Sequence, residues 1–249
     1  MKKYLRAFVM SMSMFSVIPC PFRMWDEESR PLMTLALPFV GTVIGGFWAL
    51  TAYVCRILGI PLFLKAAALC AFPFVITGGM HMDGFLDVTD AVRSWRDVEE
   101  RRRILKDPHV GSFAVIDAIL LVMVQFAAFC SLRGTENIFT LILIPTVSRC
   151  IAAFCVTVLP PLTTSEYSGS YRERVKRSHV VFLTVVTAAA AVLGFVFLGR
   201  CGYVSLAVAA GYLLYMFRAY KSLGGMSGDI SGYALTFAEL CGIVAYVLI

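Results

Sequence analysis

Residues 112–132 read SFAVIDAILLVMVQFAAFCSL, an apolar run that contains one charged residue, Asp117. A helix needs about 20 predominantly apolar residues to cross the roughly 30 Å hydrocarbon core of a bilayer. The run therefore predicts a membrane-spanning helix. Asp117 stands one turn into this helix, so we expect its side chain to reach toward the polar interface.

Six further apolar runs of similar length lie on either side of this one along the chain. They cover residues 32–55, 58–78, 138–159, 179–198, 201–217 and 233–249. A shorter segment at residues 4–18 is followed by Pro19 and Pro21, and it predicts an interfacial or half-inserted helix. The predicted fold class is all-α, a polytopic integral membrane protein with about seven transmembrane helices plus this N-terminal helix.

The composition of the chain agrees with a membrane protein. Its 249 residues are 59% hydrophobic and the mean hydropathy is +0.80, whereas soluble domains are about 45–50% apolar. Seven helices with short connections use most of this length, so we expect a single domain, residues 1–249. The eight cysteines form no CxxC pair, which argues against a zinc site or a disulfide framework.

The basic residues are distributed unevenly between the two sides of this topology. One side carries 17 of the 22 Lys and Arg residues, whereas the other side carries only Arg56, Arg133 and Arg200. The positive-inside rule places the basic loops in the cytoplasm. The formal charge of +6 is explained by this topology, and we expect the lipid bilayer rather than a nucleic acid as partner.

The densest group of acidic residues is in residues 78–91, GGMHMDGFLDVTDA. Asp83, Asp87 and Asp90 follow the spacing i, i+4, i+7, which places them within about 60° on one helical face. Like charges this close destabilise a bare helix, so the pattern favours a bound cation. Oxygen ligands near substrate phosphates suit Mg²⁺. The alternative is a solvated helix end whose carboxylates meet arginines downstream.

His81 stands at the start of this stretch, two residues before Asp83. On a continuous helix His81 would point about 160° away from Asp83. We therefore expect His81 in the turn formed by Gly78 and Gly79, just before the helix.

The next segment, residues 99–112, reads EERRRILKDPHVGS and combines a basic run with a proline-containing turn. Guanidinium and ammonium groups bind phosphate oxygens strongly. We predict that Lys106 and His109 contact a substrate phosphate. For residues 101–103 we favour an anchor for anionic lipid instead.

Arg149 lies inside an apolar span, where an arginine is costly unless it faces a partner or a wet cavity. A functional role and a structural pairing are both open, and Glu239 in the final span is a natural counter-charge. Residues 224–232, GGMSGDISG, form a glycine-rich loop whose backbone N–H groups can approach phosphate closely.

These stretches together resemble one known family. GGMHMDGFLDVTDA, then ILKDPHVGSFA at 104–114 and LGGMSGDISG at 223–232, resemble the cobalamin synthase family, the adenosylcobinamide-GDP ribazoletransferases. FSVIPCP at 15–21 and LPFVGTVIGG at 37–46 are similar to the N-terminal pattern of that family. The resemblance covers nearly the whole chain in the expected order.

The resemblance implies a Mg²⁺-dependent enzyme of the bacterial or archaeal cytoplasmic (inner) membrane, with its active site facing the cytoplasm. A ribose hydroxyl of alpha-ribazole, or of its 5′-phosphate, attacks adenosylcobinamide-GDP and expels GMP. The implied catalytic residues are His81, Asp83, Asp87 and Asp90, and the three aspartates are also the implied metal ligands. We predict as substrate-binding residues Lys106, Asp107, His109, Arg149 and Asp229.

Two other functions compete with this one. A CDP-alcohol phosphotransferase also places aspartates around a metal, but its DGxxAR pattern is absent here because DG is followed by residues 85–88, FLDV. An ion-coupled transporter would use intramembrane charges on an ion pathway, yet the sequence has no repeated halves. The sequence leaves open whether the chain forms a homo-oligomer.

Overall fold

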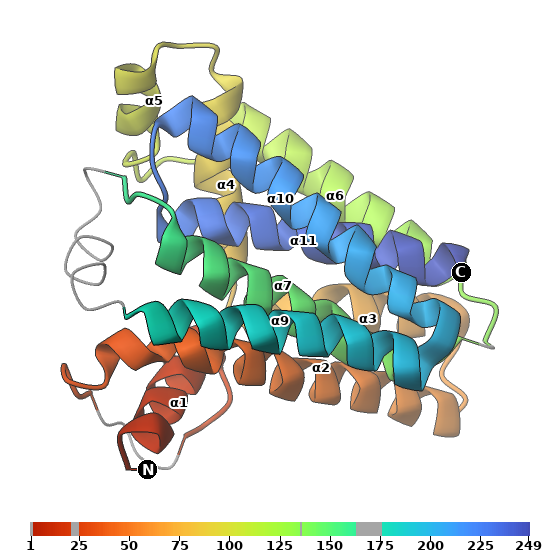
Figure 1. Cartoon of the computed structure of the whole chain (residues 1–249). Helices are drawn as coiled ribbons and strands as arrows, with labels where there is room; N and C mark the ends of the chain where they lie inside the picture. The colour runs from red at the N-terminus through yellow and green to blue at the C-terminus, as the bar shows by residue number, and fades with distance from the viewer. Residues whose placement is uncertain (1, 21–24, 135, 163–175) are drawn as a thin grey trace.

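The computed structural model describes residues 2–20, 25–134, 136–162 and 176–249. The helices in these ranges are, in chain order, α1 (Lys2–Phe15), α2 (Met33–Ile57), α3 (Leu62–Ile76), α4 (Met80–Arg93), α5 (Val98–Ile104), α6 (Ser112–Cys130), α7 (Thr140–Val158), α9 (Arg177–Leu198), α10 (Tyr203–Leu223) and α11 (Gly228–Leu248) (Figure 1). Two short 3-10 helices, η1 (Arg30–Leu32) and η2 (Gly199–Gly202), precede α2 and α10.

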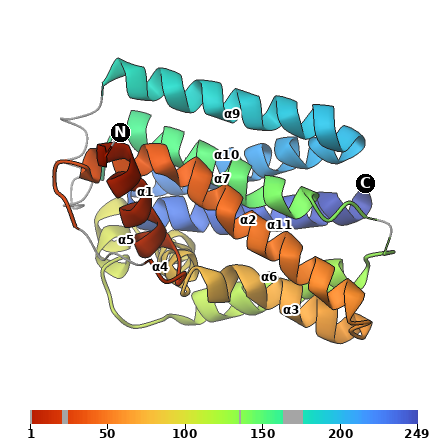
Figure 2. The ribbon, with the colours of Figure 1, turned by 90° about the horizontal axis from the view of Figure 1, so that it is seen from below.

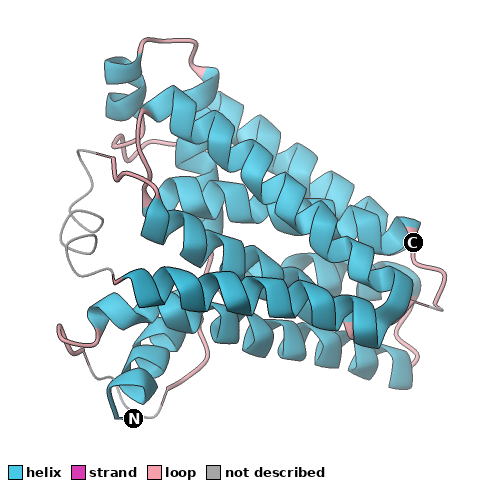
Figure 3. Cartoon of the chain, viewed as in Figure 1, coloured by secondary structure: helices cyan, strands magenta, loops and turns pink. Residues whose placement is uncertain are grey.

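The all-α fold class is confirmed. In the described part of the chain, the single β-type pairing is a bridge between Pro161 and Met226. Figure 2 shows the helices packed as a bundle, with α7 and α11 in its interior, and Figure 3 shows helices joined by loops. Part of the basic loop expected at residues 160–178 lies outside the described residues.

The number of candidate membrane spans is lower than expected. Five stretches are long and apolar enough to cross a membrane, and a sixth is added if α3 and α4, bent by 87°, are one broken span. The polytopic membrane fold is confirmed, and this count is lower than the expected seven partly because α9, with 22 residues, and α10, with 21, are counted together. Helix α3 has only 15 residues, and α9, η2 and α10 together form one 47-residue candidate. Helix α1, with 14 residues, is not among the candidates, as expected for its length.

The bend between α3 and α4 comes from two glycines. Gly78 and Gly79 have φ angles of 63° and 77°, a left-handed conformation that glycine adopts without steric cost. The N–H of Gly79 donates to the carbonyl of Phe74 and so closes the end of α3. Helix α4 therefore leaves at a steep angle and crosses one end of the bundle (Figure 1).

Small residues let the long helices approach closely. A Cβ atom on Gly45 of α2 would lie 2.6 Å from the Cα atom of Ile142, and one on Gly41 would meet the carbonyl oxygen of Pro145. Without a hydrophobic driving force between helices in lipid, close packing of this kind stabilises membrane bundles. The contact fixes α2 against α7, whose side chains line the cavity described below.

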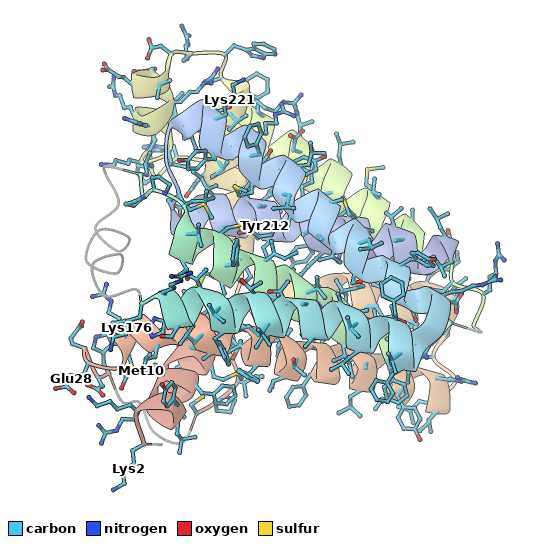
Figure 4. All side chains as sticks on the ribbon, in the orientation of Figure 1. Lys2, Met10, Glu28, Lys176, Tyr212 and Lys221 are labelled. Atoms are coloured by element: carbon cyan, nitrogen blue, oxygen red, sulfur yellow. The ribbon has the colours of Figure 1, made fainter. Side chains whose placement is uncertain are left out.

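The two ends of the bundle differ in charge. Helices α1, α4 and α5 and the loop between α10 and α11 lie at one end, and the C-terminus lies at the other (Figure 1). Figure 4 shows Lys2, Lys176 and Lys221 on the side of the first group. We call this the basic end. It holds most of the loops that the sequence assigned to one side of the membrane.

Candidate active site

Carboxylates from two helices meet at the basic end. Asp87 of α4 experiences the negative charges of Asp83, Asp229 and Asp90, and Asp229 stands in the first turn of α11. Asp83 and Asp229 are exposed, whereas Asp87 and Asp90 are half-buried. We call Asp83, Asp87 and Asp229 the acidic cluster. Within the described residues, neither Asp83 nor Asp87 makes a hydrogen bond or an ion pair with a cationic side chain.

Gly84 is the reason that the two helices can bring these groups together. A Cβ atom at this position would lie 2.9 Å from both the Cα atom and the carbonyl oxygen of Asp229. No real side chain fits in that space, so α4 and the start of α11 are in backbone contact. Gly84 was not expected from the sequence to have a role, although its place directly after Asp83 in the motif was the available signal.

We expect Gly84→Ala to destabilise the folded protein by about 1–3 kcal/mol, because the new methyl group overpacks the contact with α11. Thermal unfolding of the purified protein in detergent measures the effect. Gly46→Ala is the matched control, since a Cβ atom there meets nothing within 4 Å and alanine favours a helix. Equal unfolding temperatures of the two variants would contradict the contact.

Asp90 occupies a different environment from the acidic cluster. Its carboxylate accepts hydrogen bonds from the backbone N–H groups of Gly111 and Ala114, the latter at 2.9 Å. It therefore caps the N-terminus of α6, where a negative charge is favourable. A Cβ atom on Gly111 would lie 2.6 Å from the Oδ1 atom of Asp90, so glycine permits this close approach.

His81 is the second residue of α4 and does not lie in the preceding turn, so that expectation was wrong. Gly79 already provides the N-cap, which allows the helix to begin one residue earlier than His81. The imidazole stacks on Phe15 of α1 with ring centroids 6.3 Å apart. Its Nε2 atom is buried and has no hydrogen-bond partner among the described residues.

A cavity of about 580 Å³ adjoins the acidic cluster. Asp229, His81 and Arg149 of α7 line it, and most of the remaining lining residues are apolar. Arg149 is fully buried and forms an ion pair with Glu239 of α11, as the sequence suggested. Its Nε atom is buried and has no partner in the described part of the chain.

Lys106, Asp107 and His109 are exposed in the loop between α5 and α6. His109 donates its backbone N–H to Asp107 at 2.9 Å, and its Nδ1 atom lies 2.6 Å from the same carboxylate. These bonds lower the pKa of Asp107, so it is ionised at neutral pH. The described structure shows no contact of these three side chains with the acidic cluster. The loop reaches α4 through Gly111, which donates to Asp90.

Asp117 has a partner that the sequence analysis missed. It forms an ion pair with Arg93 at the end of α4 and does not simply reach toward the interface. The Arg93 guanidinium also lies over the ring of Phe113, 5.6 Å from its centroid. A single charge in an otherwise apolar span was the available signal, because such a charge needs a partner.

No group of three or more His, Cys, Asp or Glu side chains in the described ranges is arranged to surround a metal ion. A complete protein cage is therefore not preformed. This does not conflict with the residue types present, since Mg²⁺ usually takes one or two carboxylates together with waters and phosphate oxygens. Asp83 and Asp87 supply two such carboxylates without a competing cationic partner in the described residues.

The described residues form a membrane-embedded helical bundle in which carboxylates without a cationic partner among them lie beside basic loops. These are features of a membrane phosphotransferase, because phosphoryl transfer depends on positioning and charge neutralisation. Comparison with known proteins identifies the family. The cobalamin-5-phosphate synthase model matches residues 7–247, and the chain belongs to this family.

Several curated relatives support the assignment over the full length. The chain is 36% identical over 247 residues to the adenosylcobinamide-GDP ribazoletransferase of Clostridium perfringens strain 13, with 98% of each chain covered. It is 35% identical to that of Clostridium botulinum strain Alaska E43, covering 100% of this chain and 99% of the relative. For Lachnoclostridium phytofermentans the identity is 30%, covering 99% and 95%. No solved structure matches the chain.

Proposed function

We propose that the acidic cluster carries out the reaction named for the relatives. A ribose hydroxyl of alpha-ribazole, or of its 5′-phosphate, attacks the cobinamide-side phosphorus of adenosylcobinamide-GDP. An oxygen–phosphorus bond forms, the bond to the bridging pyrophosphate oxygen breaks, GMP leaves, and the hydroxyl loses its proton. This completes the nucleotide loop of cobalamin.

The contact between α4 and the start of α11 supports this reaction. Asp83, Asp87 and Asp229 come from distant parts of the sequence, and the backbone contact at Gly84 holds them together. Three carboxylates without a cationic partner in the described residues repel one another. Their arrangement is favourable when a cation and a phosphorylated substrate complete the site.

We propose that Asp83 and Asp87 hold Mg²⁺, and that Asp229 faces the same diphosphate. Mg²⁺ held there would neutralise the charge of the pyrophosphate and polarise its oxygens. Asp90, predicted as a third ligand or as the base, is better suited to positioning α6, because its carboxylate is occupied by backbone N–H groups. The loop with Lys106 and His109 is suited to contact phosphate once substrate bridges it to the cluster.

The cavity beside the cluster is suited to the acceptor. Its apolar walls fit the aromatic base of alpha-ribazole, and its volume is within the usual range of small-molecule sites. Arg149 lines the cavity, and its Nε–H, which has no partner among the described residues, is suited to the ribose or its phosphate. The Nε2 atom of His81 is buried and has no partner in the described residues. It can accept a hydrogen bond from the attacking hydroxyl or donate one to it.

We place the basic end in the cytoplasm, because cytoplasmic loops of membrane proteins are enriched in Lys and Arg. This orientation puts the acidic cluster on the side where nucleotide substrates are made. It also places the C-terminus on the opposite side of the cytoplasmic membrane (Figure 1).

We expect purified full-length protein in lipid nanodiscs to release GMP from adenosylcobinamide-GDP only when alpha-ribazole and Mg²⁺ are both present. Chromatographic quantification of GMP and of the corrinoid product measures the reaction. Chelation with EDTA should stop it, and added Mg²⁺ should restore it. Release of GMP at an unchanged rate in EDTA would contradict the metal assignment. Absence of GMP release under all conditions would instead favour a transporter.

A further inference from the structure

A second cleft, of about 610 Å³, lies on the side of α4 that faces away from the acidic cluster. Side chains of α4, α6, α10 and α11 line it, together with Trp95 and with Arg101 of α5. Figure 2 shows α11 between α6 and α10. The proposed reaction uses none of the side chains that line this cleft.

The cleft contains polar groups without partners. The hydroxyl of Thr89, in a residue only 1% exposed, and the Nε atom of Arg101 are both buried and lack hydrogen-bond partners in the described residues. Arg218 on α10 also lines the cleft and forms no ion pair within the described ranges. Burying polar groups without partners is costly. The part of the cleft that these three side chains line is therefore suited to an anionic ligand.

The cleft keeps a net positive charge after the ion pair between Arg93 and Asp117 is subtracted. Arg93 lines it too, but Asp117 neutralises that side chain. Arg101 and Arg218 remain as surplus positive charges. We therefore expect the ligand to carry a phosphate group, because guanidinium groups bind phosphate through charge-assisted hydrogen bonds.

The walls of the cleft continue into membrane-facing surfaces. Leu120 and Val124 of α6 line the cleft and are exposed, and Leu214 and Phe217 are exposed on neighbouring turns of α10. Helix α6 and the stretch that contains α10 are candidate membrane spans. Apolar side chains exposed on such spans face acyl chains, so the cleft is open toward the lipid.

Trp95 marks the polar rim of the cleft. It is 88% exposed, and its φ angle of 55° is a left-handed conformation that is unfavourable for a bulky residue. Tryptophan is enriched at the level of lipid headgroups. A solvent-exposed indole held in this conformation at the basic end is therefore suited to the membrane interface.

We propose that this cleft is a binding site for an anionic glycerophospholipid. The headgroup phosphate lies between Arg101 and Arg218 and accepts a hydrogen bond from the hydroxyl of Thr89. One acyl chain follows the apolar side chains of α6. The site is distinct from the substrate site and independent of the proposed reaction, because α4 separates the cleft from the acidic cluster.

Native mass spectrometry of the full-length protein, released from nanodiscs, tests the proposal. We expect phosphatidylglycerol to remain bound in preference to phosphatidylcholine. The double variant Arg101→Gln, Arg218→Gln should weaken phosphatidylglycerol binding about 25-fold, because each arginine contributes about fivefold. Arg103→Gln is the matched control, since this side chain is exposed, pairs with Glu100 and does not line the cleft. It should bind like the unmodified protein.

Single variants test the same site if the double variant does not fold. Arg218→Gln alone removes an exposed side chain and should lower affinity about fivefold, and Thr89→Val removes only the hydroxyl. Equal binding of phosphatidylglycerol and phosphatidylcholine, or unchanged binding by Arg218→Gln, would overturn the proposal. Displacement of the lipid by millimolar inorganic phosphate or GMP would also overturn it, since it would indicate a site for soluble phosphate.

Discussion

Asp83→Asn abolishes turnover: we expect GMP release from adenosylcobinamide-GDP to fall by at least about 10²–10³-fold, the loss typical of removing one preorganised electrostatic group. Asparagine has the same shape but lacks the charge that holds a divalent cation. Asp83 is exposed, and its side chain makes no hydrogen bond or ion pair within the described residues, so the substitution should leave membrane insertion and folding intact. The GMP assay in nanodiscs, together with thermal unfolding, measures both effects.

Two comparison variants make this result specific. Glu99→Gln neutralises an exposed carboxylate on α5 and should retain the activity of the unmodified protein. Asp90→Asn alters the cap of α6, so its main effect should be a lower unfolding temperature. If purified Asp83→Asn protein released GMP at close to the normal rate, the assignment of the acidic cluster would be wrong.

The second large effect concerns the buried ion pair between Arg149 and Glu239. Glu239→Ala should destabilise the protein by about 3–5 kcal/mol, because it leaves the Arg149 guanidinium charged, buried and unpaired. We expect little folded protein from this variant. Size-exclusion chromatography and thermal unfolding in detergent measure the loss.

A double variant separates the structural role of Arg149 from its proposed role in binding. Replacing both members with methionine removes the two charges together, and such a replacement is often neutral for stability. We expect Arg149→Met, Glu239→Met to fold but to bind alpha-ribazole poorly, with a higher KM. A folded double variant with a normal KM would make Arg149 a structural residue only. A Glu239→Ala variant as stable as the unmodified protein would contradict the importance of the pair.

The sequence predicted several features of the candidate site because they depend on local spacing. Asp83 and Asp87 are one turn apart, so any helix through them places their carboxylates on one face. The pairing of Arg149 with Glu239 was also predictable, since a charge in an apolar span needs a partner and few are available. Neither inference required knowledge of how the helices pack.

Asp90 shows where local spacing is insufficient. It lies on the same helical face as Asp83, yet its carboxylate binds the start of α6. Helical periodicity gives the direction of a side chain but not what it meets there. The cavity beside Asp229 and the second cleft, proposed to bind lipid, could not be predicted for the same reason. Both are bounded by helices far apart in the sequence.

The sequence alone determined that this is an all-helical membrane protein and indicated its family, because apolar run length and motif order are properties of the chain itself. Tertiary structure alone decided that Gly84 brings Asp229 to Asp83 and Asp87, and that Asp90 caps a neighbouring helix. It also decided the angle of 87° between α3 and α4 at the turn that the sequence placed at Gly78 and Gly79, so that α4 crosses the end of the bundle. These features depend on contacts between helix backbones, and such contacts are set by the packing of the whole molecule.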